Sequence, residues 1–141
     1  MEHILFDIAQ KELNILKDFH RTLKEERDAI ISFSIDGIIR GNNKKEELLK
    51  KIEFLEAEKE KLIRENPEPE KILNDSRWVT ISREIKSIMN EINIALGKNI
   101  NLLSFSVDYV KNSIDNIVDF VNKASYNNKK ARLSVFPPRE I

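Results

Sequence analysis

The sequence predicts an all-α protein built from three long helices, and three observations support this. Over most of the chain, apolar residues recur at alternating spacings of three and four, the period of one helix face. Charged residues make up 34% of the chain, which contains only three glycines and four prolines, and this composition is typical of long helices with charged outer faces. Because apolar and polar residues do not alternate in runs of strand length, we expect no β-sheet.

The first helix is expected over residues 3–31. Its apolar seam keeps the three-four spacing throughout: Phe6, Ala9, Leu13, Leu16, His20, Leu23, Arg27 and Ile30. Residues 32–34, Ser-Phe-Ser, then predict a break in which Ser34 caps the next helix. Asp36 in the first turn of that helix would complement the positive end of its dipole.

The second helix is expected over residues 34–65, antiparallel to the first. The residues of its main seam are Ile38, Lys45, Leu48, Ile52, Leu55, Lys59 and Leu62. Pro67 and Pro69 end this helix because proline lacks the backbone N–H that a helix interior requires. We expect the turn to continue to about residue 75.

The third helix is expected over residues 76–122 and is the longest. Its seam consists of Trp78, Ile81, Ile85, Ile88, Ile92, Leu96, Ile100, Leu103, Val107, Val110, Ile114, Ile117 and Val121. Two spacings of four follow each other at Ile88, Ile92 and Leu96, just before Gly97, and mark a weak point. We expect one continuous helix. The alternative is a helix end at Gly97, with the last segment folded back onto the bundle.

The seam stops at Val121, and the composition changes there. Residues 123–141 hold five basic side chains against Glu140 alone: Lys123, Lys129, Lys130, Arg132 and Arg139. We therefore expect a helical bundle over residues 1–122 and a basic, flexible tail over residues 123–141.

The lengths of the three helices do not match. The third spans about 45 residues, or about 70 Å, and the first two span about 30 residues, or about 45 Å each. An up-down-up bundle would leave the third helix without a neighbour beyond about residue 103, where its apolar seam continues. This part of the seam, the docking stripe, is the candidate binding surface and consists of Leu103, Val107, Val110, Ile114, Ile117 and Val121.

Charge and composition argue against several classes of partner and compartment. Because 24 basic residues balance 24 acidic ones, the chain lacks the net basic surface that nucleic-acid binding requires. No cysteine is present, so disulfides and thiol chemistry are impossible. No apolar run approaches the ~20 residues that span a bilayer, and the N-terminus lacks the basic start of a secretory signal. We expect a cytoplasmic protein without membrane insertion.

Catalytic and metal-binding patterns are also missing. His20 has no glutamate or histidine at the spacing of a helical metal site, and His3 lies at the expected fraying end. Asp108, Asp115 and Asp119 are more typical of a solvated helix face, and no glycine-rich phosphate loop occurs. We therefore expect a binding protein and not an enzyme, with no catalytic residues, metal or cofactor.

Four segments resemble FlgN-type flagellar export chaperones, in the same order and over nearly the whole chain. They are LKEERDAI at residues 23–30, KEELLKKIEFLEAEK at 45–59, NLLSFSVDYV at 101–110 and YNNKKARLS at 126–134. The chain departs from this family at the first turn, where the family's Gly-Asp pair is replaced by SIDG at residues 34–37. It departs again after Tyr126, where Lys130 and Ala131 stand in place of a glycine.

The resemblance implies a cytosolic chaperone that holds hook-associated (hook–filament junction) proteins for the flagellar type III export gate. Capture of an amphipathic cargo helix by the docking stripe would suit such a function. The resemblance also implies that Tyr126 docks on the export gate. Two rival hypotheses remain: a coiled-coil scaffold that self-associates through the stripe as a homodimer or larger assembly, and a nucleic-acid adaptor that acts through its basic tail.

Overall fold

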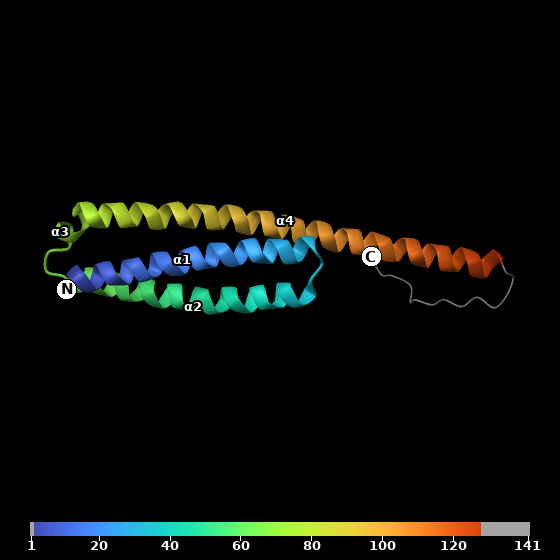
Figure 1. The fold of residues 1–141 in the computed structure, drawn as a ribbon, viewed down its shortest axis with the longest axis horizontal. Coiled ribbons are helices and arrows are strands. Elements are labelled where there is room, and N and C mark those ends of the chain that lie inside the picture. Colours follow the sequence, from blue (N-terminus) through green and yellow to red (C-terminus); the bar gives the residue numbers. More distant parts are fainter. Residues whose placement is uncertain (1, 128–141) are drawn as a thin grey trace. The chain divides into compact units, whose positions relative to one another are not determined.

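The computed structural model describes the backbone of residues 2–127 and the side chains of residues 3–124. Four helices follow one another: α1 (Glu2–Ile31), α2 (Ile35–Glu65), α3 (Pro69–Leu73) and α4 (Ser76–Asn127) (Figure 1). No strand occurs in this described part of the chain, so the prediction of an all-α protein is confirmed. The chain divides into two compact units between Leu102 and Leu103.

The predicted break between α1 and α2 is confirmed, and its chemistry is local. Ser34 is the N-cap of α2, and its hydroxyl accepts a hydrogen bond from the backbone N–H of Gly37 at 3.2 Å. Phe33 reverses the chain in the left-handed region, with φ of 55°. The turn is tight, because a Cβ at Gly37 would lie only 2.8 Å from the Cβ of Ala29. Glycine at this position therefore lets α2 start close to the end of α1.

The three long helices α1, α2 and α4 are accompanied by a short fourth helix, α3, which lies where only a turn was predicted. Pro69 is the first residue of α3, where its fixed φ and missing N–H are tolerated. Asn66 accepts a hydrogen bond from the N–H of Glu68 at 2.8 Å and shapes the approach to α3. Ile72 of α3 is only 2% exposed, so the helix brings an apolar side chain into the core.

Two ion pairs between α1 and α2 show in which direction α2 runs relative to α1. Glu12 pairs with Lys59, whose Nζ lies 3.1 Å from the Oε2 atom of Glu12, and Glu26 pairs with Lys45 at 2.7 Å. As the residue number rises along α1, that of its partner falls along α2, so α1 and α2 form an antiparallel hairpin.

Contacts between α1 and the first part of α4 run in the opposite sense. The ring of Phe6 meets Trp78 edge to face, with centroids 6.0 Å apart, and Asn99 donates a hydrogen bond to the backbone oxygen of Leu23 at 2.8 Å. Residue numbers rise together in these pairs, so this part of α4 follows the direction of α1.

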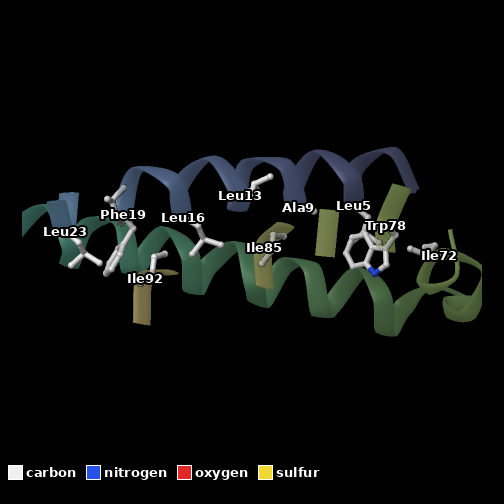
Figure 2. Close-up of a cluster of buried hydrophobic side chains, with 11 residues drawn as sticks. Leu5, Ala9, Leu13, Leu16, Phe19, Leu23, Ile72, Trp78, Ile85 and Ile92 are labelled. Carbon is white, nitrogen blue, oxygen red and sulfur yellow. The ribbon is translucent and has the colours of Figure 1, made fainter. Parts of the chain in front are cut away.

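The core of the first unit lies between α1, α2, α3 and the start of α4. Its members are Leu5, Ala9, Leu13, Leu16, Phe19, Leu23, Leu48, Ile72, Trp78, Ile85 and Ile92. Figure 2 shows Trp78 close to Leu5 and Ile72 at one end of this cluster. Two predicted seam positions are wrong: Arg27 is exposed and Ile100 is 65% exposed, whereas their neighbours Glu26 and Asn99 are buried.

Helix α4 runs unbroken through Gly97 (Figure 1), so the alternative of a helix end at this glycine is wrong. A Cβ at Gly97 would meet nothing within 4 Å, so no close contact requires glycine there. The described part of the helix reaches Asn127, beyond the predicted end at residue 122. Residues 123–127, predicted to belong to a flexible tail, are therefore helical, and the remainder of that predicted tail lies outside the described residues.

Candidate docking site on α4

The docking stripe forms one face of α4 in the second unit. Because a helix turns 100° per residue, spacings of four and three keep its six side chains within an arc of about 80°. Five are exposed: Leu103 (42%), Val107 (57%), Val110 (45%), Ile114 (43%) and Ile117 (55%). The sixth, Val121, is half-buried. The stripe is thus a continuous apolar surface that solvent reaches in the described structure.

The same helix face is buried earlier in α4. Trp78, Ile85 and Ile92 continue the line of the docking stripe towards the N-terminus, and each is only 7% exposed. Trp78 touches Phe6 of α1, so the core of the first unit covers this portion. The apolar face therefore changes along α4 from buried to exposed, although its residue types and spacing stay nearly the same.

Asp108, Asp115 and Asp119 share a different face of α4, because they are seven and four residues apart. Their row, the acid row, lies about 140° around the helix from the middle of the docking stripe. The acid row therefore does not border the docking stripe, and cargo lying on the stripe would not contact all three carboxylates.

An aromatic surface beside the acid row was not predicted from the sequence. Phe105, Tyr109 and Phe120 are 71%, 60% and 73% exposed, and their spacings of four and eleven place them within an arc of about 60°. We name these three residues the aromatic face. A helical period search could have found it, but the three-four pattern of the docking stripe dominates this segment. Helix α4 thus exposes two separate apolar surfaces after residue 102.

Tyr126, the predicted export-gate contact, lies in the last turn of α4. Its backbone is helical, whereas the sequence predicted that Tyr126 belongs to a tail. Residues 128–141, which complete the segment that resembles the chaperone family, lie outside the described residues.

A buried charge cluster joins α1 to α2 in the first unit. The side chain of Glu12 is 2% exposed and that of Lys59 is 12% exposed. The ammonium group of Lys59 lies 3.1 Å from Glu12 and 2.9 Å from Glu56. Two carboxyl groups thus share one cation, of which Glu12 is buried and Glu56 is 46% exposed, and the buried one is favoured in its protonated form.

Glu12 is the carboxyl group that holds the proton. Burial, and then its hydrogen bond with Glu56, raise the pKa of Glu12 from 4.5 to about 7 against the opposing effect of Lys59. Burial also opposes ionisation of Glu56, but its hydrogen bonds with Glu12 and Lys59 outweigh burial and lower its pKa. At pH 5 Glu12 is therefore neutral and Glu56 is ionised.

Glu12→Gln should remove a pH dependence of stability. Between about pH 4.5 and 7 folded Glu12 keeps a proton that the unfolded chain releases, so the free energy of unfolding falls as pH rises through this window. At pH 8 the variant should exceed the wild type by about 1–3 kcal/mol, with little difference at pH 5. Urea unfolding at both values measures this. The exposed Glu25→Gln is the control, and a wild type as stable at pH 8 as at pH 5 would refute the assignment.

A second buried carboxylate ties α1 to both other long helices. Glu26, with a side chain only 6% exposed, pairs with Lys45 of α2 at 2.7 Å. Its Oε1 atom also accepts a hydrogen bond from Asn99 of α4 at 3.1 Å, and Asn99 is itself only 4% exposed. Because each of these buried polar groups has a specific partner, a slip of one helix along another would leave charges unpaired.

Among the described residues, no three His, Cys, Asp or Glu side chains converge as metal ligands would. His20 contacts Glu91 at 3.9 Å, and His3 contacts Asp7 at 3.5 Å. None of the described helices combines the length and apolar character needed to cross a bilayer.

Comparison with models of protein families, with curated protein sequences and with solved structures finds no match for this chain. Its functional assignment therefore rests on the exposed surfaces of α4 and on the segments that resemble the chaperone family.

Proposed function

We propose that this protein is a cytosolic export chaperone for hook-associated proteins, whose terminal amphipathic helices it holds for the flagellar type III export apparatus. One observation carries the proposal: the docking stripe keeps a core-like pattern of apolar residues on a helix face that is exposed. Large contiguous apolar surfaces of this kind mark sites of protein interaction. The segments that resemble the chaperone family indicate which partner occupies it.

Capture of a cargo helix would rest on apolar burial. Each half-exposed side chain of the stripe would contribute about 1 kcal/mol when covered. The six together would contribute several kcal/mol before the loss of rotational and translational freedom is subtracted. Binding in the micromolar range is the natural outcome, which is strong enough to shield a cargo helix and weak enough to release it.

Parallel titrations of a purified hook-associated protein and of flagellin test the proposal. The chaperone should bind the hook-associated protein at 1:1 ratio and bind flagellin at least tenfold more weakly. Deletion of the terminal helices of the hook-associated protein should abolish the signal. The proposal would be contradicted if the chaperone bound both proteins with equal affinity, or if it bound neither of them.

The stripe also suits the rival hypothesis of a coiled-coil scaffold, because a second copy can cover an apolar face as well as cargo can. Sedimentation velocity separates the two hypotheses. A scaffold should assemble through the stripe with rising concentration and show no affinity for hook-associated proteins, whereas a chaperone should lose self-association through the stripe when cargo is added.

Tyr126→Ala should separate the holding of cargo from its delivery. We propose that Tyr126 contacts the export gate, because a tyrosine offers apolar area and a hydroxyl group with little loss of side-chain freedom. It lies beyond the last residue of the docking stripe, so the variant should keep wild-type cargo affinity and secrete less hook-associated protein. Calorimetry and a secretion assay on the same variant measure both properties. Wild-type secretion would remove Tyr126 from the export step, and lost affinity would assign it to cargo binding.

A further inference from the structure

A small pocket lies between α1 and the first part of α4, within the first unit. It encloses about 230 Å³, and its apolar lining side chains are all aliphatic. The lining residues are His20, Leu23, Lys24 and Arg27 of α1 and Glu91, Ile94, Ala95, Lys98 and Asn99 of α4. Because three of them are lysine or arginine, we name this site the cationic pocket.

Buried hydrogen bonds fix the shape of the cationic pocket. Asn99 is 4% exposed, and its amide donates to the backbone oxygen of Leu23 at 2.8 Å and to Glu26 at 3.1 Å. Leu23 is itself only 1% exposed. These bonds hold α4 against α1 at the level of Lys24 and Lys98, so the pocket is preformed in the contact between the two helices.

The three cations stand on both walls of the pocket. Lys24 and Arg27 belong to the α1 wall, where they are one helical turn apart, and Lys98 belongs to the α4 wall. All three side chains are exposed. None of them forms an ion pair with a carboxylate of the part of the chain that the structure describes.

The acidic residues nearby are engaged elsewhere or lie at the far end. Glu91 is the only acid among the described lining residues, and it faces His20 at 3.9 Å, about 10 Å along α4 from the lysine of that helix. Glu26 is balanced by a lysine of α2 at 2.7 Å. Glu25 and Asp28 line a different groove, between α1 and α2. The end of the pocket that holds the three cations is therefore positively charged.

The size and lining of the pocket limit what it can hold. Sites for whole small-molecule ligands begin at about 300 Å³, so a pocket of about 230 Å³ suits one side chain of a larger partner. Its aliphatic lining suits a leucine or isoleucine, which gains by leaving water. The described lining contains no Phe, Tyr or Trp ring on which a nucleic-acid base would stack.

We propose that the cationic pocket binds an acidic peptide segment of a partner protein: an aliphatic side chain enters the pocket, and carboxylates on both sides of it pair with Lys24 and Arg27 on one wall and with Lys98 on the other. On a helix, the residues directly before and after such an anchor point about 100° away from it in opposite directions. A Glu-Leu-Glu segment therefore supplies one carboxylate to each wall, with charge-assisted hydrogen bonds. The pocket belongs to the first unit, so the inference does not rest on the docking stripe or on the proposed cargo.

Titration of the full chain with synthetic peptides tests the proposal. The probe is an alanine-rich helical peptide of about 20 residues with Glu-Leu-Glu at its centre. The wild type should bind it with a dissociation constant on the order of 100 μM, and more weakly in about 0.5 M salt than in about 0.05 M salt. Peptides with Gln-Leu-Gln or Glu-Ser-Glu instead should bind about tenfold more weakly or less. Equal binding of all three peptides, or no binding of the first, would overturn the proposal.

Arg27→Glu combined with Lys98→Glu should weaken binding of the Glu-Leu-Glu peptide by about tenfold or more. The helical circular dichroism should stay unchanged, because both side chains are exposed. Lys17→Glu with Lys86→Glu is the matched control, since it reverses one exposed cation of α1 and one of α4 outside the pocket. The control should stay within about threefold of the wild type. Equal losses in both variants would show that net charge, and not the pocket, binds the peptide.

Two further measurements distinguish other binding sites and partners. The peptide should bind the Val110→Asp, Ile117→Asp variant as tightly as the wild type, and a loss there would move the peptide to the docking stripe and overturn the proposal. Vesicles of anionic phospholipid are the second probe. If they bound the wild type but not the Arg27→Glu, Lys98→Glu variant, while the peptide bound neither, the pocket would serve a lipid surface and the proposal would be wrong.

Discussion

Val110→Asp combined with Ile117→Asp should reduce the affinity for a hook-associated protein by more than 100-fold. Both side chains lie on the docking stripe and are 45% and 55% exposed. A cargo helix that covers them would have to bury two carboxylates without partners, each at a cost of several kcal/mol. The free chain can solvate the same carboxylates, so its helical circular dichroism should stay nearly unchanged. Calorimetric titration with the cargo measures the loss.

Asn112→Asp with Asn116→Asp is the matched control for that variant. It adds the same charge to the same segment of α4, at two exposed positions off the docking stripe. Its cargo affinity should stay within about threefold of the wild type, since exposed charges contribute little at this range. Equal losses in both variants would show that net charge, and not the stripe, controls binding. Unfolding of the Val110 and Ile117 variant would show that these residues belong to a core.

Lys59→Met should lower the free energy of unfolding by about 1–2 kcal/mol at pH 8, because loss of the cation raises the pKa of the buried Glu12 further above its usual range and the folded chain must then take up a proton at that pH. At pH 5 the loss should be smaller. Glu12 is neutral at pH 5 in the wild type as well, so removal of the cation leaves no ionised Glu12 without a partner there. Urea unfolding at the two pH values measures both losses.

Lys51→Met serves as the control for Lys59→Met. Lys51 also pairs with a glutamate, Glu47, at 3.3 Å, but both side chains are more than half exposed. Such a pair contributes less than about 1 kcal/mol. Equal losses of stability in the two lysine variants at pH 8 would show that burial of Glu12 does not make its ion pair with Lys59 more important for stability than an exposed pair.

The helices of the first unit were largely predictable because their limits depend on local chemistry. Ser34 caps α2 with its own hydroxyl, and Pro67 and Pro69 cannot continue a helix interior. The helix α3 was not predicted, because proline can end one helix and also begin the next. Pro69 was interpreted only as a residue that ends α2, and not as the first residue of a new helix. The depth of Ile72 in the core depends on tertiary packing, which a short segment does not encode.

Buried charges were harder to predict than apolar seams. Glu12 and Glu26 lie beside the predicted seam of α1, and nothing in the three-four pattern distinguishes them from solvated glutamates such as Glu25. They are buried because Lys59 and Lys45 of α2 reach them from across the hairpin. Such a pairing depends on the register of two helices, which is fixed only when the whole core forms.

The docking stripe, too, could be predicted only in part from the sequence. The sequence placed the six residues of the docking stripe on one face, but spacing alone does not reveal whether a face is covered. Trp78 and Ile114 belong to one seam of α4, yet the first is 7% exposed and the second 43%. The aromatic face was missed because its spacing of eleven between Tyr109 and Phe120 skips two helical turns, where Ser113 and Asn116 stand.

Hydrogen exchange of the full chain, with and without a hook-associated protein, tests the central claim most directly. Backbone amides of a helix with an uncovered apolar face open readily, because tertiary packing supplies most helical stability. Amides of residues 103–121 should therefore exchange fast in the free protein and at least tenfold more slowly with cargo bound, while those of the core around Leu13 and Leu48 stay unchanged. Protection confined to α1 and α2, or no protection in α4, would contradict cargo capture by the docking stripe.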